Sequence, residues 1–144
     1  MSDEKESYPS QNNIRGLIQD VSERFDAMSN ELRKGTEFAD TRPADAKTFM
    51  LISRHPRGLT ELAKALKISR QATHRSVQRL VEAGVVQFTY AEGSKRDMIA
   101  QVTKKGLQAR KVGIAIAKQI ESDVVARVGK DDLEALRHIL VKLC

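Results

Sequence analysis

A cluster of polar side chains between positions 70 and 79 is the part of this sequence best suited to chemistry with a nucleic acid. On a helix its members project together, and each carries a hydrogen-bond donor that can reach a phosphate or a base edge. Arg75 and Arg79 are expected to bind phosphates, whereas residues nearer the helix start are placed to read bases. His74 could equally be a surface histidine without a special role. The expected DNA-binding set is Arg70, Gln71, His74, Arg75, Gln78 and Arg79.

Two short helices joined by a tight polar turn are predicted to position these side chains. The segment LAKALKISRQATHRSVQRLVEAGVV has one apolar stripe before the turn and another after it. Ser69 stands where an N-cap hydroxyl would accept from free backbone amides, and Gly84 where a helix ends in a left-handed residue. The pattern predicts a helix-turn-helix with one donor-rich face left free. The predicted buried stripes are Leu62, Ala63, Leu66 and Ile68, then Val77, Leu80 and Val81.

A β-hairpin is predicted directly after the second of these helices. Apolar residues alternate along Val86–Tyr90 and again along Met98–Val102, as in paired strands with one buried face. The tip between them contains a glycine and two adjacent cations, Lys95 and Arg96. This position after a recognition helix is typical of the wing of a winged helix-turn-helix, so both cations are expected to contact DNA.

The charge is concentrated in the same central region. The 144-residue chain has a net charge of +6, but residues 51–110 carry 12 Lys/Arg against 4 Asp/Glu, a net +8. Such an excess favours a polyanionic partner. The three histidines are scattered, no Cys/His pair has ligand spacing, and no glycine-rich phosphate loop is present, so we expect no enzyme, metal or cofactor. The lone Cys144 and the lack of a long apolar run favour a cytoplasmic protein away from membranes.

Long amphipathic helices are predicted on both sides of this centre. The expected organisation is a disordered tail over 1–10, an N-terminal dimerisation helix over 11–41, the winged helix-turn-helix DNA-binding domain over 42–103, and C-terminal dimerisation helices over 104–144. A helix over Ala44–Arg54 should bury Phe49, Met50 and Ile52, and Thr60 should cap the next helix. The flanking stripes exceed what the centre can cover, which predicts a homodimer. The expected dimerisation residues are Ile14, Leu17, Val21, Phe25, Ile120, Val124, Leu133, Leu136, Leu140 and Leu143.

These features closely resemble the MarR family of bacterial transcriptional regulators. The resemblance rests on LAKALKIS, HRSVQRLVEAGVV, QVTKKG with Thr103 and Gly106, and ARVGKDDLEALRHIL, and it extends over nearly everything after residue 10. It implies a mainly α-helical fold with a small β-hairpin and a dimer whose recognition helices enter successive major grooves of double-stranded DNA. It further implies a repressor that responds to a small-molecule effector. The alternative is a winged helix used for protein–protein assembly without specific DNA binding.

Two departures from the family pattern concern the wing and the effector. Ser94 stands where family members usually have an aspartate that braces the wing arginine. The segment around Ala46 lacks the aromatic residue that many members have between the two domains, which leaves the effector open.

Overall fold

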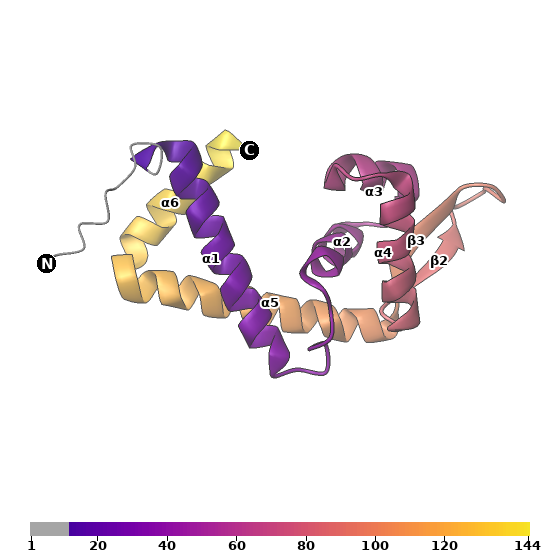
Figure 1. Cartoon of the computed structure of the whole chain (residues 1–144), viewed down its shortest axis with the longest axis horizontal. Coiled ribbons are helices and arrows are strands. Elements are labelled where there is room, and N and C mark those ends of the chain that lie inside the picture. The colour runs from indigo at the N-terminus through magenta and orange to yellow at the C-terminus, as the bar shows by residue number, and fades with distance from the viewer. Residues whose placement is uncertain (1–11) are drawn as a thin grey trace, which may run out of the picture.

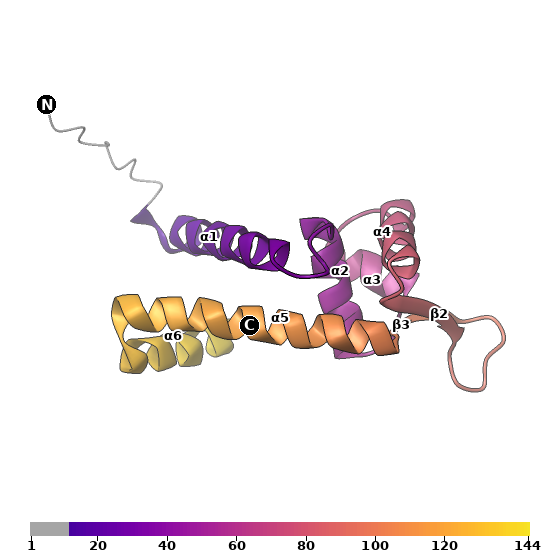
Figure 2. The same ribbon diagram turned by 90° about the horizontal axis from the view of Figure 1, so that it is seen from below.

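The computed structural model describes residues 12–144, which form an elongated molecule with a lobe at either end of one long helix (Figure 1). That helix is α5 (Lys104–Val128). One lobe contains α2 (Pro43–Arg54), α3 (Leu59–Leu66), α4 (Arg70–Glu82) and a small sheet. The other contains α1 (Ile14–Lys34), which crosses α5, and α6 (Lys130–Leu143), which folds back from its end (Figure 2). The predicted fold class, mainly α-helical with a winged helix-turn-helix, is confirmed.

Side-chain caps explain where the main helices begin. Asn13 Oδ1 accepts a hydrogen bond from the amide of Gly16 at 2.8 Å at the start of α1. Ser69 Oγ accepts from the amide of Ala72 at 3.0 Å at the start of α4, as the sequence predicts. Gly84 follows α4 with φ of +80°, the left-handed conformation that favours glycine.

The sheet has three antiparallel strands in the order β1-β3-β2. β2 (Val86–Tyr90) and β3 (Met98–Val102) form the predicted hairpin, with Val86 opposite Val102. The third strand, β1 (Arg57–Gly58), pairs with β3 and is absent from the prediction. Because the chain is extended there, α3 begins at Leu59 with Gly58 in the N-cap position, so the prediction that Thr60 caps this helix is wrong.

The core lies between α2, α3, α4 and the sheet. Its buried apolar side chains are Phe38, Ile52, Leu62, Val77, Leu80, Val85, Val86 and Ala100. Two predicted core positions are exposed instead. Met50 is 54% exposed, because it lies on the side of α2 opposite the buried Thr48 and Ile52, and Ile68 is 44% exposed, because α3 ends before it. Ile52 is only 1% exposed, as expected.

Ion pairs connect the helices of the other lobe. Arg24 of α1 donates to Asp123 of α5 at 2.9 Å, and Arg137 of α6 lies 2.8 Å from Glu121 of α5. The hydrogen bond from Arg137 holds the pKa of the Glu121 carboxyl below its usual range. Pairs this exposed contribute little to stability, so they orient the helices more than they stabilise them.

Apolar residues on α1 and α6 remain uncovered within the single chain. Neither helix contains a fully buried residue. Large side chains are nevertheless exposed along both, namely Ile14, Leu17, Ile18, Val21 and Leu32 on α1 and Leu136, Ile139, Leu140, Val141 and Leu143 on α6. An apolar surface of this extent is typical of an interaction site.

Candidate nucleic-acid interface

The outward face of α4 presents most of the predicted DNA-binding side chains to solvent. Five of the six are exposed: Arg70, Gln71, His74, Arg75 and Gln78. The opposite face of α4 packs into the core through Thr73, Ser76, Val77 and Leu80. This division follows from the helical period, because buried residues at i, i+3, i+4 and i+7 leave the other side free. The structure therefore brings these five donors onto one accessible surface.

The wing stands next to this surface. The hairpin tip is closed by a hydrogen bond from the Ala91 amide to the Asp97 carbonyl oxygen at 2.8 Å. Ser94 Oγ accepts from the amides of Arg96 and Asp97, both at 3.1 Å. The serine that replaces the usual wing aspartate thus orders the backbone of the tip. Lys95 and Arg96 are both exposed.

A groove of about 380 Å³ lies between the start of α3, the recognition helix α4 and the wing. It is lined by Arg70 and His74 from α4, by Arg96 and Asp97 from the wing, and by Gly58 and Thr60 near the start of α3. The His74 ring stacks on Phe88 of β2, with a 6.1 Å centroid separation and 17° between planes. The groove thus joins two predicted DNA-binding elements, and Phe88 is part of its lining.

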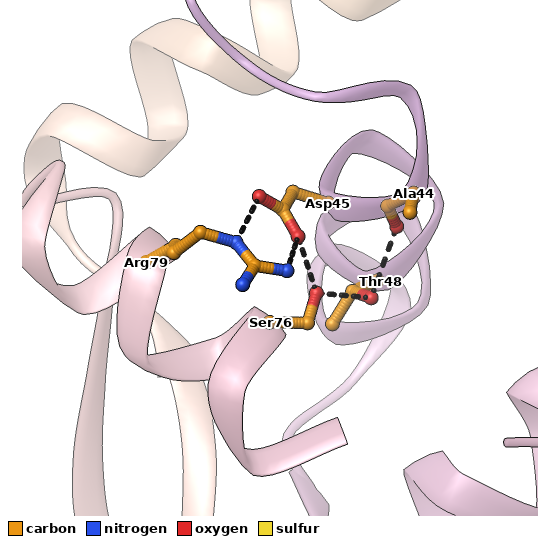
Figure 3. Close-up of polar contacts among 5 residues, drawn as sticks. All are labelled: Ala44, Asp45, Thr48, Ser76 and Arg79. Atoms are coloured by element: carbon orange, nitrogen blue, oxygen red, sulfur yellow. Dashed lines mark hydrogen bonds and ion pairs between the residues drawn. The ribbon is translucent and has the colours of Figure 1, made fainter. Parts of the chain in front are cut away.

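Arg79 is the exception among the predicted contacts. Its side chain turns toward α2, where Nε donates to Asp45 Oδ2 at 2.8 Å and Nη2 donates to Asp45 Oδ1 at 2.9 Å (Figure 3). The Arg79 side chain is 36% exposed, whereas that of Asp45 is 4% exposed. Its predicted role as a phosphate contact competes with this bidentate ion pair.

Ser76 of α4 binds the same carboxylate. Its Oγ donates to Asp45 Oδ1 at 2.7 Å and is hydrogen-bonded to Thr48 Oγ1 at 2.9 Å. Thr48 Oγ1 also lies 3.1 Å from the Ala44 carbonyl oxygen, so its one proton is shared between that oxygen and Ser76 Oγ, which completes the network in Figure 3. Each side-chain oxygen of Asp45, Thr48 and Ser76 therefore has a partner, which the low dielectric constant of the core requires.

The protonation of Asp45 is set by opposing effects. Burial alone would raise the pKa of its carboxyl, but hydrogen bonds from Arg79 and Ser76 and the charges of Arg79 and Arg42 outweigh burial and hold that pKa below its ordinary value. The same ion pair raises the pKa of Arg79. The stabilisation from Asp45 is thus complete above the unfolded-state pKa of about 3.9 and is lost as pH falls through the lower folded-state pKa.

Sequence reasoning missed Asp45, Thr48 and Ser76. One signal could have found two of them: Asp45 and Thr48 stand seven and four positions before the buried Ile52, in the apolar stripe of α2. A carboxylate in such a stripe requires a cationic or donor partner.

The predicted dimerisation residues fall into two groups. Ile14, Leu17 and Val21 of α1 are exposed, as are Leu136, Leu140 and Leu143 of α6. The others are partly covered by their own chain, namely Phe25, Ile120, Val124 and Leu133.

Two other features bear on partners. Within residues 12–144, no group of three or more His, Cys, Asp or Glu side chains is placed to hold a metal ion. None of the helices in this part of the chain combines the length and apolar character needed to cross a membrane.

The fold and the exposed donor face define a winged helix-turn-helix protein. Residues 40–97 match the model of the MarR family. The chain is also similar in structure to FabT of Streptococcus pneumoniae in complex with DNA, with TM-score 0.74 and 16% identity over 90% of this chain and 92% of that one. Apo MarR from E. coli gives TM-score 0.75 and 22% identity over 91% and 96%. BpsR of Bordetella bronchiseptica gives TM-score 0.68 and 15% identity over 94% of this chain and 96% of that one.

No curated protein matched the sequence. At these identities the likeness to solved structures shows the fold, and the family match adds the winged-helix segment. The family match over residues 40–97 and the shared fold support a MarR-family winged-helix regulator.

Proposed function

We propose that the protein is a dimeric, sequence-specific DNA-binding repressor in the cytoplasm that responds to a small-molecule ligand. The groove carries the DNA-binding part of this proposal, because Arg70 and His74 of the recognition helix and Arg96 of the wing line one hollow. A duplex seated on α4 would place its sugar-phosphate backbone along such a groove while base edges face the helix. Arg75 and Lys95 add exposed charge beside it.

The dimeric part rests on the uncovered apolar faces of α1 and α6. Two such lobes from symmetry-related chains would bury these side chains against each other. A two-fold axis would also place two recognition helices on one side of the duplex, with half-sites about one helical turn, or roughly 10 bp, apart.

The ligand response is supported by likeness alone: DNA binding by BpsR is regulated by 6-hydroxynicotinic acid. In a two-fold dimer, a ligand that prefers a different spacing of the recognition helices would shift the population away from the DNA-binding form and release the operator.

The test is a binding titration of a duplex from the gene's own promoter region at several salt concentrations. Arg75, Lys95 and Arg96 together would supply about six phosphate contacts per dimer, which predicts a slope of log affinity against log salt of about −5. Absence of binding at low salt would contradict DNA binding. Binding with equal affinity to unrelated duplexes would contradict specificity.

We expect the recognition helix to determine the base preference and the wing to contribute sequence-independent affinity. Gln71→Ala should lose about 1 to 3 kcal/mol of discrimination at one base pair in each half-site, because glutamine can bond adenine in a bidentate manner. Arg96→Ala should weaken binding to most sequences alike. Binding-site selection with both variants measures the difference. If Gln71→Ala keeps the wild-type preference while Arg96→Ala changes it at major-groove positions, the two roles are reversed.

A further inference from the structure

We infer that Asp45 is a positioning residue for DNA recognition: it clamps α4 to α2 through Ser76 and Arg79 and withholds the Arg79 guanidinium from phosphates. This inference rests on the proposed function and assigns a role to residues outside the outward face of α4. Three observations carry it: the burial of Asp45, its bidentate contact with Arg79, and the second donor from the same helix.

The Asp45 carboxylate holds α4 at two points along the helix. Ser76 and Arg79 lie one helical turn apart and both donate to the Asp45 carboxylate, at 2.7 Å and at 2.8 and 2.9 Å respectively. A planar guanidinium that forms two parallel bonds has little freedom to rotate about either. The carboxylate therefore resists both rotation of α4 about its axis and sliding along it.

The energetics favour a role in specificity over one in stability. A buried ion pair loses its hydration, and a well-packed apolar pair of similar volume is often as stable. What the ion pair adds is a fixed relative geometry. Because direct base readout depends on where Gln71 and its neighbours meet the base edges, an α4 free to shift would discriminate less well.

The clamp also couples α4 to α2, in addition to the packing of α4 against α3 and β2. Apart from α4, helix α2 packs against α3, β3 and α5, and α5 extends into the lobe with the uncovered apolar faces. Movement of α2 would carry the recognition helix with it as long as Asp45 holds Ser76 and Arg79. Asp45 thus lies on the physical connection between the proposed dimer lobe and the DNA-binding surface.

The test compares Arg79→Gln with Arg75→Gln in the salt titration of the full-length protein. Arg75 is exposed one turn before Arg79, so it is the matched control. Loss of one phosphate contact per protomer should reduce the salt slope by about 1.8 per dimer for Arg75→Gln. Arg79→Gln should leave the slope at the wild-type value while lowering the ratio of operator affinity to random-duplex affinity at least fivefold.

Two further variants distinguish positioning from simple loss of structure. Ser76→Ala removes one donor with little change in volume and should lower the specificity ratio by a smaller factor, about twofold. Arg79→Lys keeps the charge but lacks the bidentate fork, so it should not restore the ratio. All ratios are measured at temperatures where each variant is fully folded by circular dichroism.

The outcomes separate the two proposals. If wild-type protein binds no duplex, the proposed function is overturned. If wild-type protein binds and Arg79→Gln lowers the salt slope as much as Arg75→Gln does, Arg79 is a phosphate contact and the clamp is overturned. An unchanged specificity ratio in folded Arg79→Gln would overturn the positioning role as well.

Discussion

Leu136→Asp is expected to convert the proposed dimer into a monomer and to lower its affinity for operator DNA at least about 100-fold. Leu136 is 39% exposed on α6, among several other uncovered apolar side chains. Covering this exposed remainder of the leucine by a second chain is worth roughly 1 kcal/mol. In a two-fold dimer each substitution is present in both protomers, so its effect on the interface is doubled. A carboxylate in such an interface would also lose its hydration without gaining a partner. A monomer would retain one recognition helix and lose the gain from binding two half-sites together.

Light scattering gives the mass of the variant, and the promoter-region titration gives its affinity. Leu136→Met is the matched control, since methionine keeps a similar apolar volume and should leave both quantities near the wild-type values. Circular dichroism is the check that Leu136→Asp is folded. A folded variant of unchanged dimer mass would remove this part of α6 from the interface.

The helices and the hairpin were predictable because their signals are local. Apolar spacing, the Ser69 cap and the left-handed position of Gly84 each depend on a few neighbouring residues, and the structure confirms them. The two-residue strand β1 was not predictable in this way. Its pairing with Ala100 and Ile99 depends on residues some 40 positions away, and two residues are too few to show alternation.

The candidate DNA-binding site was likewise predictable only where its signals are local. Periodicity correctly places Arg70, Gln71, His74, Arg75 and Gln78 on the free face of α4. Arg79 lies only about 40° from Arg75 around the helix, since four residues correspond to slightly more than one turn. Helical spacing alone therefore assigns it to the same face. Its ion pair with Asp45, 34 positions away, depends on how α2 packs against α4, which the spacing within α4 does not contain.

Gly106 occupies the tightest position at the junction of α5 and the wing. It lies in the first turn of α5, where its amide donates to Thr103 Oγ1 at 3.1 Å, and Thr103 Oγ1 donates to the Gly84 carbonyl oxygen. A Cβ at Gly106 would overlap the Val85 carbonyl oxygen and lie 2.5 Å from Val102 Cγ1. The neighbours are backbone and a strand residue, so the helix and the base of the wing would have to move apart.

Gly106→Ala is therefore expected to lower the free energy of unfolding by about 3 kcal/mol, because overpacking here displaces backbone instead of a flexible side chain. Gly113→Ala is the matched control: it lies on the same helix with no atom within 4 Å of the new Cβ, so it should stabilise by about 0.5 to 1 kcal/mol. Urea unfolding measures both changes in stability at equal protein concentration, since the stability of the proposed dimer depends on that concentration. Wild-type stability in Gly106→Ala would show that α5 and the wing separate at little cost, and that the close approach of Gly106 to Val85 does not hold the wing in place.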